Sequence, residues 1–98
     1  MFIRMLRLEE SLRKSFDLSS HQVAVHAAAP CPVEIKRRMI DWGGPIINEY
    51  YGSTEGMGLT AINSQEWLKH PGSVGPPLRC SIKILDEHHK PLPPNEIG

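Results

Sequence analysis

Along residues 1–18, apolar side chains recur every three or four positions, with charged residues between them. This spacing predicts an amphipathic helix, because residues three and four apart lie on the same helix face. The apolar positions that carry the pattern are Phe2, Met5, Leu6, Leu8, Leu12 and Phe16. The sequence Asp17-Leu18-Ser19-Ser20 then predicts the end of this helix.

A short, mostly apolar run at residues 22–28 predicts a buried strand. Pro30-Cys31-Pro32 ends it, and a helix is predicted from Val33 to about Asp41, because a proline is tolerated at the start of a helix. We expect its polar side, Glu34-Lys36-Arg37-Arg38, to be exposed. The residues expected to face inward are Val33, Ile35, Met39, Ile40 and Trp42.

Gly43-Gly44-Pro45 is expected to end the helix, and residues 46–50 form a second apolar run that predicts a strand. A strand, a helix and a strand within about 30 residues indicate a parallel pair joined by a crossover helix. The predicted fold class is therefore α/β. A parallel sheet of two strands has both edges unpaired, which favours a chain that is part of something larger.

The rest of the chain is more polar and richer in proline and glycine. Beyond Thr60 it is polar around Trp67, and a Pro/Gly-rich joint follows at Pro71 to Pro77. Residues 81–94 alternate weakly around a turn sequence and predict a β-hairpin. We therefore divide the chain into an α/β part at residues 1–70 and the incomplete start of a β-rich part at residues 71–98.

Composition excludes several classes of protein. The 98 residues hold 11 Lys+Arg and 11 Asp+Glu, so the basic excess typical of nucleic-acid binding is missing. No apolar run is long enough for a membrane span, and Arg4, Arg7 and Glu9 interrupt any signal-peptide core. We therefore expect a cytoplasmic protein. Cys31 and Cys80 lack the spacing of a zinc site or a disulfide framework.

The loop that follows the second predicted strand holds most of the candidate chemistry. Its glycines allow backbone to approach a ligand, its hydroxyls can bind phosphate oxygens, and Glu55 offers a hard oxygen that suits Mg²⁺. Open α/β sheets bind ligands at this end of their strands. A Gly-rich turn with a solvated Glu55 is the structural alternative, and the residues alone leave both interpretations open. The loop reads Tyr50-Tyr51-Gly52-Ser53-Thr54-Glu55-Gly56-Met57-Gly58.

Other catalytic classes find little support. The phosphate-binding pattern GxxxxGK[ST] and the nucleophile elbow GxSxG are both absent. His26 lies on a predicted buried strand and is interpreted as a hydrogen-bonded core histidine, while His88 and His89 lie in a predicted turn and are expected to be solvated. A hydrolase is therefore disfavoured.

Four segments in unbroken order resemble the adenylate-forming superfamily, and in particular acyl-CoA synthetases of the fatty-acid ligase type. The loop at residues 50–56 is similar to the superfamily signature YGxTE. The upstream segment His26-Ala27-Ala28-Ala29-Pro30-Cys31-Pro32 and the downstream segments Gly72-Ser73-Val74-Gly75-Pro76-Pro77 and Leu92-Pro93-Pro94-Asn95-Glu96-Ile97-Gly98 also match. The resemblance covers about residues 10–98. It implies a fragment of the N-terminal domain of such a ligase, with a β-barrel-like subdomain beginning near residue 71.

The resemblance assigns roles to individual positions. Adenine would lie between Ala28-Ala29-Pro30 and Tyr51, with Glu49 near its amino group. Thr54 would bind the α-phosphate, and Glu55 would hold Mg²⁺; these two are the implied catalytic residues. Ala27 and Gly56 would border the acyl pocket. The residues implied to bind nucleotide are Ala28, Ala29, Pro30, Glu49, Tyr50, Tyr51, Gly52, Ser53 and Thr54.

The implied reaction joins a fatty or other hydrophobic carboxylic acid to AMP, with ATP and Mg²⁺, and then transfers the acyl group to coenzyme A. Such a parent enzyme is cytoplasmic, with peripheral membrane association left open. This chain lacks the family's Lys-containing phosphate loop, its ribose-binding Asp and its C-terminal catalytic Lys, so we expect an internal fragment that is inactive alone. The alternative is a small interaction module without chemistry, which self-associates into a homo-oligomer through unpaired strand edges.

Overall fold

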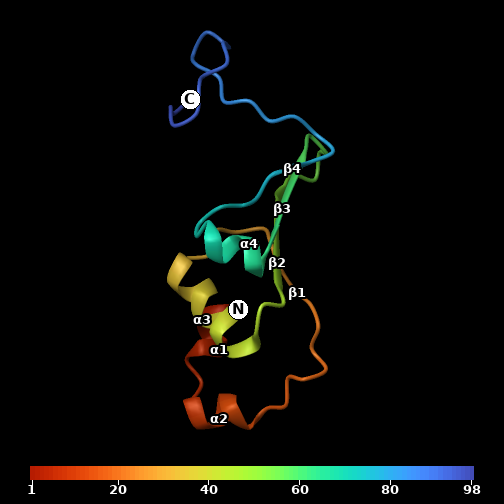
Figure 1. Ribbon diagram of the computed structural model, residues 1–98, viewed down its shortest axis with the longest axis vertical. Coiled ribbons are helices and arrows are strands. Elements are labelled where there is room, and N and C mark those ends of the chain that lie inside the picture. Colours follow the sequence, from red (N-terminus) through yellow and green to blue (C-terminus); the bar gives the residue numbers. More distant parts are fainter.

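The computed structural model describes residues 1–98 and contains one small sheet with helices on one side of it (Figure 1). The strands are β1 (Ala24–His26), β2 (Ile47–Gly52), β3 (Leu59–Asn63) and β4 (Pro77–Leu78), in the spatial order β1-β2-β3-β4. The helices are α1 (Phe2–Leu6), α2 (Glu10–Ser15), α3 (Val33–Gly43) and α4 (Ser64–Lys69). No helix has the length and apolar character that crossing a membrane requires.

The predicted strand, helix and parallel strand are confirmed. β1 pairs with β2 in parallel, α3 forms the crossover, and Gly44 caps α3 with a φ of 83°. The mixed α/β class follows from this unit. Because the two strands are parallel, their carboxyl ends meet at the same edge of the sheet.

The sheet is larger than the sequence predicts. β2 also pairs with β3, in antiparallel orientation, so the loop at residues 53–58 is the turn of a hairpin. Of the two parallel strands, β2 is therefore paired on both sides, and β1 has an unpaired outer edge. The polar stretch beyond Thr60 therefore includes half of a strand and all of α4. Asn63 caps α4 by accepting a hydrogen bond from the Glu66 amide, which is the N-cap interaction that favours Asn at this position.

The predicted helix over residues 1–18 is wrong in its length. It divides into α1 and α2, separated by Arg7, Leu8 and Glu9. The first segment packs on α3, where Leu6 is buried. The second contacts α3 only through Arg13, which lies over the Trp42 ring, whereas its Leu12 and the following Phe16 remain largely exposed. The helical spacing of apolar residues continues through the second half, but no other part of the chain packs against Leu12 and Phe16. Short helices in water need such packing.

The predicted hairpin at residues 81–94 is present only in a minimal form. A single antiparallel bridge joins Leu85 and Pro91, with a hydrogen bond from the Asp86 amide to the Lys90 carbonyl, around a turn in which the Asp86 side chain accepts the amides of His88 and Lys90. Pro91, Pro93 and Pro94 have no amide N–H, so a regular ladder cannot extend through them. This segment stands away from the sheet and lengthens the molecule to 55 × 23 × 23 Å (Figure 1).

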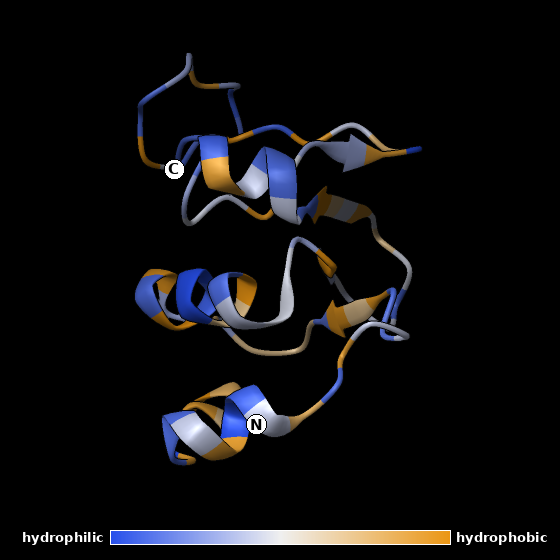
Figure 2. Ribbon diagram, turned by 60° about the horizontal axis from the view of Figure 1, so that its bottom comes forward, coloured by the Kyte–Doolittle hydropathy of each residue, from blue (hydrophilic) through white to orange (hydrophobic).

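The core lies between the sheet and the helices, and it is small. The helices show hydrophilic and hydrophobic bands (Figure 2), and their apolar residues contribute most of it. Val33, predicted to face inward, is 40% exposed. Lys36, predicted to be solvated, is 0% exposed, which is the larger correction. The buried hydrophobic residues are Leu6, Met39, Ile40, Ile47, Ile62 and Trp67.

The segment after α4 returns to the sheet and lies against β3. The Thr60 hydroxyl donates to the Val74 carbonyl at 2.8 Å, and the Ala61 amide donates to the Pro76 carbonyl at 3.3 Å. Gly75 has a φ of 87°, and a Cβ there would overlap the Ala61 carbonyl. Only glycine fits this approach, which brings residues 72–74 beside the carboxyl end of β2.

Candidate functional site

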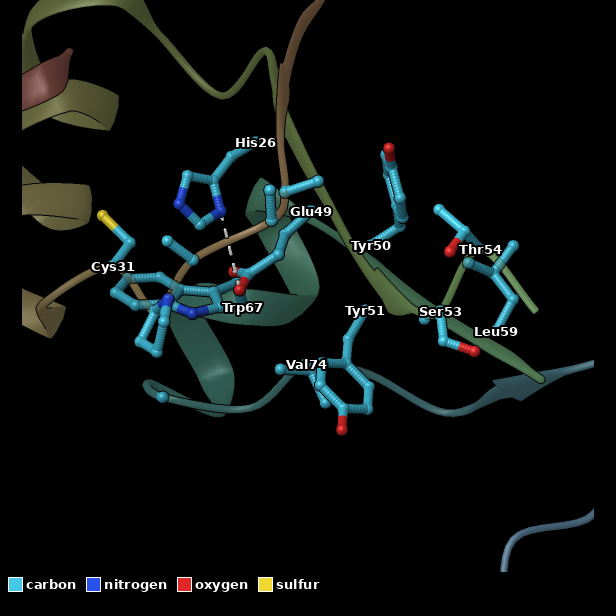
Figure 3. A pocket seen from close by; sticks show the side chains of 16 residues that line it. His26, Cys31, Glu49, Tyr50, Tyr51, Ser53, Thr54, Leu59, Trp67 and Val74 are labelled. Atoms are coloured by element: carbon cyan, nitrogen blue, oxygen red, sulfur yellow. Dashed lines mark ion pairs between the residues drawn. The ribbon is translucent and has the colours of Figure 1, made fainter. Parts of the chain in front are cut away.

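A cavity of about 560 Å³ opens where β1 and β2 end (Figure 3). Ala27 to Pro30 leave the end of β1, and Tyr50 to Thr54 form the end of β2 and the start of its hairpin turn. Cavities of several hundred Å³ are typical of small-molecule sites. The position agrees with the expectation that this edge of the sheet holds the ligand.

The structure brings most of the predicted site residues together. The cavity is lined by every residue predicted to bind nucleotide and by Ala27. Glu55 and Gly56 lie farther along the hairpin turn and do not line it. The complete lining is His26, Ala27, Ala28, Ala29, Pro30, Cys31, Glu49, Tyr50, Tyr51, Gly52, Ser53, Thr54, Leu59, Trp67, Gly72 and Val74.

Ala28 adopts a left-handed backbone conformation, with a φ of 73°. A residue with a Cβ rarely adopts it, and such strain costs about 1–3 kcal/mol and gathers at functional sites. The turn redirects the chain after β1, so that Ala29 and Pro30 run along the cavity wall. An extended backbone at Ala28 would continue β1 instead.

The two tyrosines at the end of β2 point in opposite directions, as the alternation of side chains along a strand requires (Figure 3). Tyr51 lies between the two ends of the cavity, with its side chain on the same side as Val74. It is 65% exposed, so one ring face is available to a flat ligand. Glu49, His26 and Trp67 lie at one end of the cavity, and Ser53, Thr54 and Leu59 at the other.

Glu49 is the centre of a largely buried polar cluster. It is the register partner of His26 on the parallel strand β1, and the two side chains share the inner face of the sheet. From α3, Lys36 Nζ donates to Glu49 Oε2 and lies 4.7 Å from the centroid of the Trp67 ring. The cluster therefore joins β1, β2, α3 and α4 beneath one end of the cavity.

His26 is not the hydrogen-bonded core histidine that the sequence predicts. Its Nδ1 is buried without a hydrogen-bond partner and lies 3.6 Å from Oε1 of Glu49, beyond hydrogen-bond length. A buried nitrogen without a partner is costly, and it commonly marks a place where a water or a ligand completes the bond. The structure thus moves His26 from the core to the wall of the cavity.

The hairpin turn carries hydroxyls and one carboxylate. Hydrogen bonds from the Glu55 amide and from the Ser53 side chain hold the pKa of Glu55 below its usual range, and the Thr54 hydroxyl lowers it further. The carboxylate is therefore charged at neutral pH, with its oxygens exposed to solvent. The turn presents two hydroxyls and a fixed negative charge within three consecutive residues.

Cys31 lines the cavity as a free thiol. Burial raises its pKa, and the nearby Glu49 carboxylate raises it further, so it remains protonated at neutral pH. A thiol in this state is a weak nucleophile. Cys31 therefore contributes surface to the cavity wall and no covalent chemistry.

Several residues of the site could not be found by motif. The burial of Lys36 is the one feature that the sequence could have indicated. Lys36 lies three and four positions before Met39 and Ile40, which are both buried, and so shares their helix face. Trp67 and Val74 arrive through α4 and the segment that follows it. Nothing local in the sequence indicates that these elements fold back beside β2.

The model of the AMP-binding enzyme family matches residues 1–98, which is the whole chain. The chain belongs to this family.

Proposed function

We propose that this member of the AMP-binding enzyme family is part of an acyl-CoA synthetase, and that residues 1–98 form one wall of its acyl-adenylate site. The enzyme would activate a fatty or other hydrophobic carboxylic acid as acyl-AMP and transfer the acyl group to coenzyme A. The observation that carries the proposal is the gathering of Ala28, Ala29, Pro30 and the end of β2 around one cavity. These segments are distant in sequence.

The cavity suits AMP in its size and in the order of its side chains. Adenine would lie between the backbone of Ala28 to Pro30 and the ring of Tyr51, with its amino group toward Glu49. Ser53 and Thr54, at the opposite end, would then meet the α-phosphate (Figure 3). An aromatic ring in the middle of the cavity and hydroxyl donors at one end match the flat base and the charged phosphate of a nucleotide.

Glu55 fits a role in holding Mg²⁺ against the phosphates. Its lowered pKa keeps it charged, and it is adjacent to Thr54, which lines the cavity. No cluster of three or more His, Cys, Asp or Glu residues is present. A single carboxylate is compatible with Mg²⁺, which usually binds through one or two carboxylates together with substrate phosphates. When bound, the ion would neutralise charge that develops on the phosphates.

A hydrophobic acyl group is supported by a second cavity of about 320 Å³, which shares part of its wall with the first. Ala27 lines both cavities, and the second is mostly apolar, with Phe2, Val25 and Ile35 among its residues. An acyl chain could therefore extend past Ala27 into apolar surroundings. Gly56 lines neither cavity, and its place beside the acyl group stays a prediction.

Replacing Tyr51 with alanine is expected to weaken AMP binding by about 5- to 150-fold, because base stacking contributes about 1–3 kcal/mol. Tyr51→Phe keeps the ring and is expected to stay within about threefold of the wild type. Isothermal titration calorimetry of the 98-residue chain with AMP measures both. Equal affinities for the wild type and Tyr51→Ala would contradict the placement of the base.

The alternative function is a self-associating module without chemistry. It is favoured by β1, whose outer edge is open and whose Val25 is 62% exposed. For the ligase wall we expect AMP binding, no ATP–pyrophosphate exchange by the 98 residues with any fatty acid, and a mass independent of concentration. Concentration-dependent assembly without AMP binding, followed by analytical ultracentrifugation, would support the module instead. Exchange activity would contradict the expected inactivity of the chain alone.

A further inference from the structure

Thr60 is the cross-strand neighbour of the tyrosine that lies in the middle of the cavity. It is the register partner of Tyr51 in the antiparallel pair of β2 and β3, so the two side chains stand on the same face of the sheet. Thr60 is buried, with 3% of its surface exposed, and it does not line the cavity. Any effect of Thr60 on a bound ligand must therefore pass through another residue.

The hydroxyl of Thr60 holds the segment at residues 72–76 on this face. It donates to the Val74 carbonyl at 2.8 Å, and the neighbouring Ala61 amide donates to the Pro76 carbonyl at 3.3 Å. The second bond comes from the backbone, so any residue at position 61 other than proline could make it. The bond from Thr60 is the one that depends on a side chain of the sheet.

The held segment brings Val74 to the side of the cavity on which the Tyr51 side chain lies (Figure 3). Both residues line the cavity. The Tyr51 ring is largely exposed, so few contacts of its own fix its orientation. Ordering a side chain on binding costs affinity, whereas a side chain that is ordered beforehand avoids this cost. An apolar neighbour that restricts the ring would therefore favour the binding of a flat ligand.

Building on the proposed function, we propose that Thr60 is a positioning residue for Tyr51. By holding the Val74 carbonyl, Thr60 keeps the Val74 side chain beside the ring of Tyr51. The ring is thereby restricted to one rotamer, in which a base can stack between the ring and the backbone of residues 28–30. The hydroxyl of Thr60 thus acts on binding through Val74 and touches no ligand itself.

A purely structural role for Thr60 predicts a different pattern. If its hydroxyl only ties residues 72–76 to the sheet, its loss weakens AMP binding to the same extent with or without the Tyr51 ring. If it acts through the ring, its loss has no effect once the ring has been removed, and a double-mutant cycle separates the two cases. Thr60→Val removes the hydroxyl and keeps the branched shape, while Thr60→Ser keeps the hydroxyl and is the matched control.

The test follows AMP binding to the 98-residue chain by NMR titration, which also measures weak affinities. Thr60→Val is expected to weaken binding by about 3- to 10-fold, and Thr60→Ser by less than about twofold. In the Tyr51→Ala background, adding Thr60→Val is expected to change the affinity by less than about twofold. Three-bond couplings about χ1 of Tyr51 in the free chain are expected to show one rotamer in the wild type and in Thr60→Ser, and an average of several in Thr60→Val.

Equal losses with and without the Tyr51 ring overturn the inference, while AMP binding by the wild type upholds the proposed function. Several rotamers of Tyr51 in the wild type, or a single one in Thr60→Val, overturn it independently. Where Thr60→Val does not fold, Val74→Ala takes its place with the same expected results, because Val74 is 37% exposed and lies outside the core. A wild type that does not bind AMP overturns the proposed function and this inference together.

Discussion

Lys36→Met is expected to lower the free energy of unfolding by about 3–5 kcal/mol, because it leaves Glu49 charged and unpaired in a largely buried place. The side chains of Lys36 and Glu49 are 0% and 11% exposed, so water replaces the missing ammonium group only poorly. Methionine fills a similar volume, which keeps a packing defect from dominating the result. Urea denaturation followed by circular dichroism measures the change. A variant that shows no cooperative unfolding transition is destabilised even further and also supports the prediction.

Removing both charges provides the control. Lys36→Met/Glu49→Gln is expected to regain most of the lost stability, because replacing both partners of a buried pair is far less costly than removing one. A single variant within about 1 kcal/mol of the wild type would show that Glu49 is solvated or neutral, and that the buried pair does not exist in solution.

Trp67→Ala is expected to have an effect of similar size, again about 3–5 kcal/mol. The indole is 1% exposed, packs in the core and covers the ammonium group of Lys36, so its loss leaves a cavity and removes a cation–π contact as well. The same urea titration measures it. Leu68→Ala, at the next position but 39% exposed, is the matched control and should change stability by less than about 1 kcal/mol.

Equal losses for Trp67→Ala and Leu68→Ala would contradict the placement of α4. The indole would then lie outside the core, and the floor beneath Glu49 would have to be built from other residues. A large loss at Trp67 alone supports the return of α4 to the sheet, on which one end of the cavity depends.

The unit that positions the site could be predicted because its signals are local. Pro32 precedes α3, Gly44 ends it, and apolar runs flank the helix on both sides, so the strand, helix and parallel strand follow from neighbouring residues. The carboxyl ends of the two strands then lie together, and the candidate nucleotide residues meet at that edge without any further information.

The remaining features depend on contacts between distant segments. β3 is not predicted because it continues directly into α4, with no turn sequence between them. The burial of Lys36 depends on Glu49, which lies on a different element, and hydrophobic patterning assigns a lysine to solvent by default. The C-terminal hairpin is shorter than predicted for the opposite reason: the alternation is present, but the prolines remove the donors that a longer ladder needs.

The central claim, that this cavity binds AMP, is tested most directly by a ¹H–¹⁵N NMR titration of the 98-residue chain with AMP. Saturable shifts are expected at the amides of Ala28, Tyr51, Ser53 and Thr54, which line the cavity. The amides of the turn at residues 86–90 should not move, because that turn stands away from the sheet (Figure 1). Saturable shifts confined to other residues, or none at all at millimolar AMP, would contradict the account.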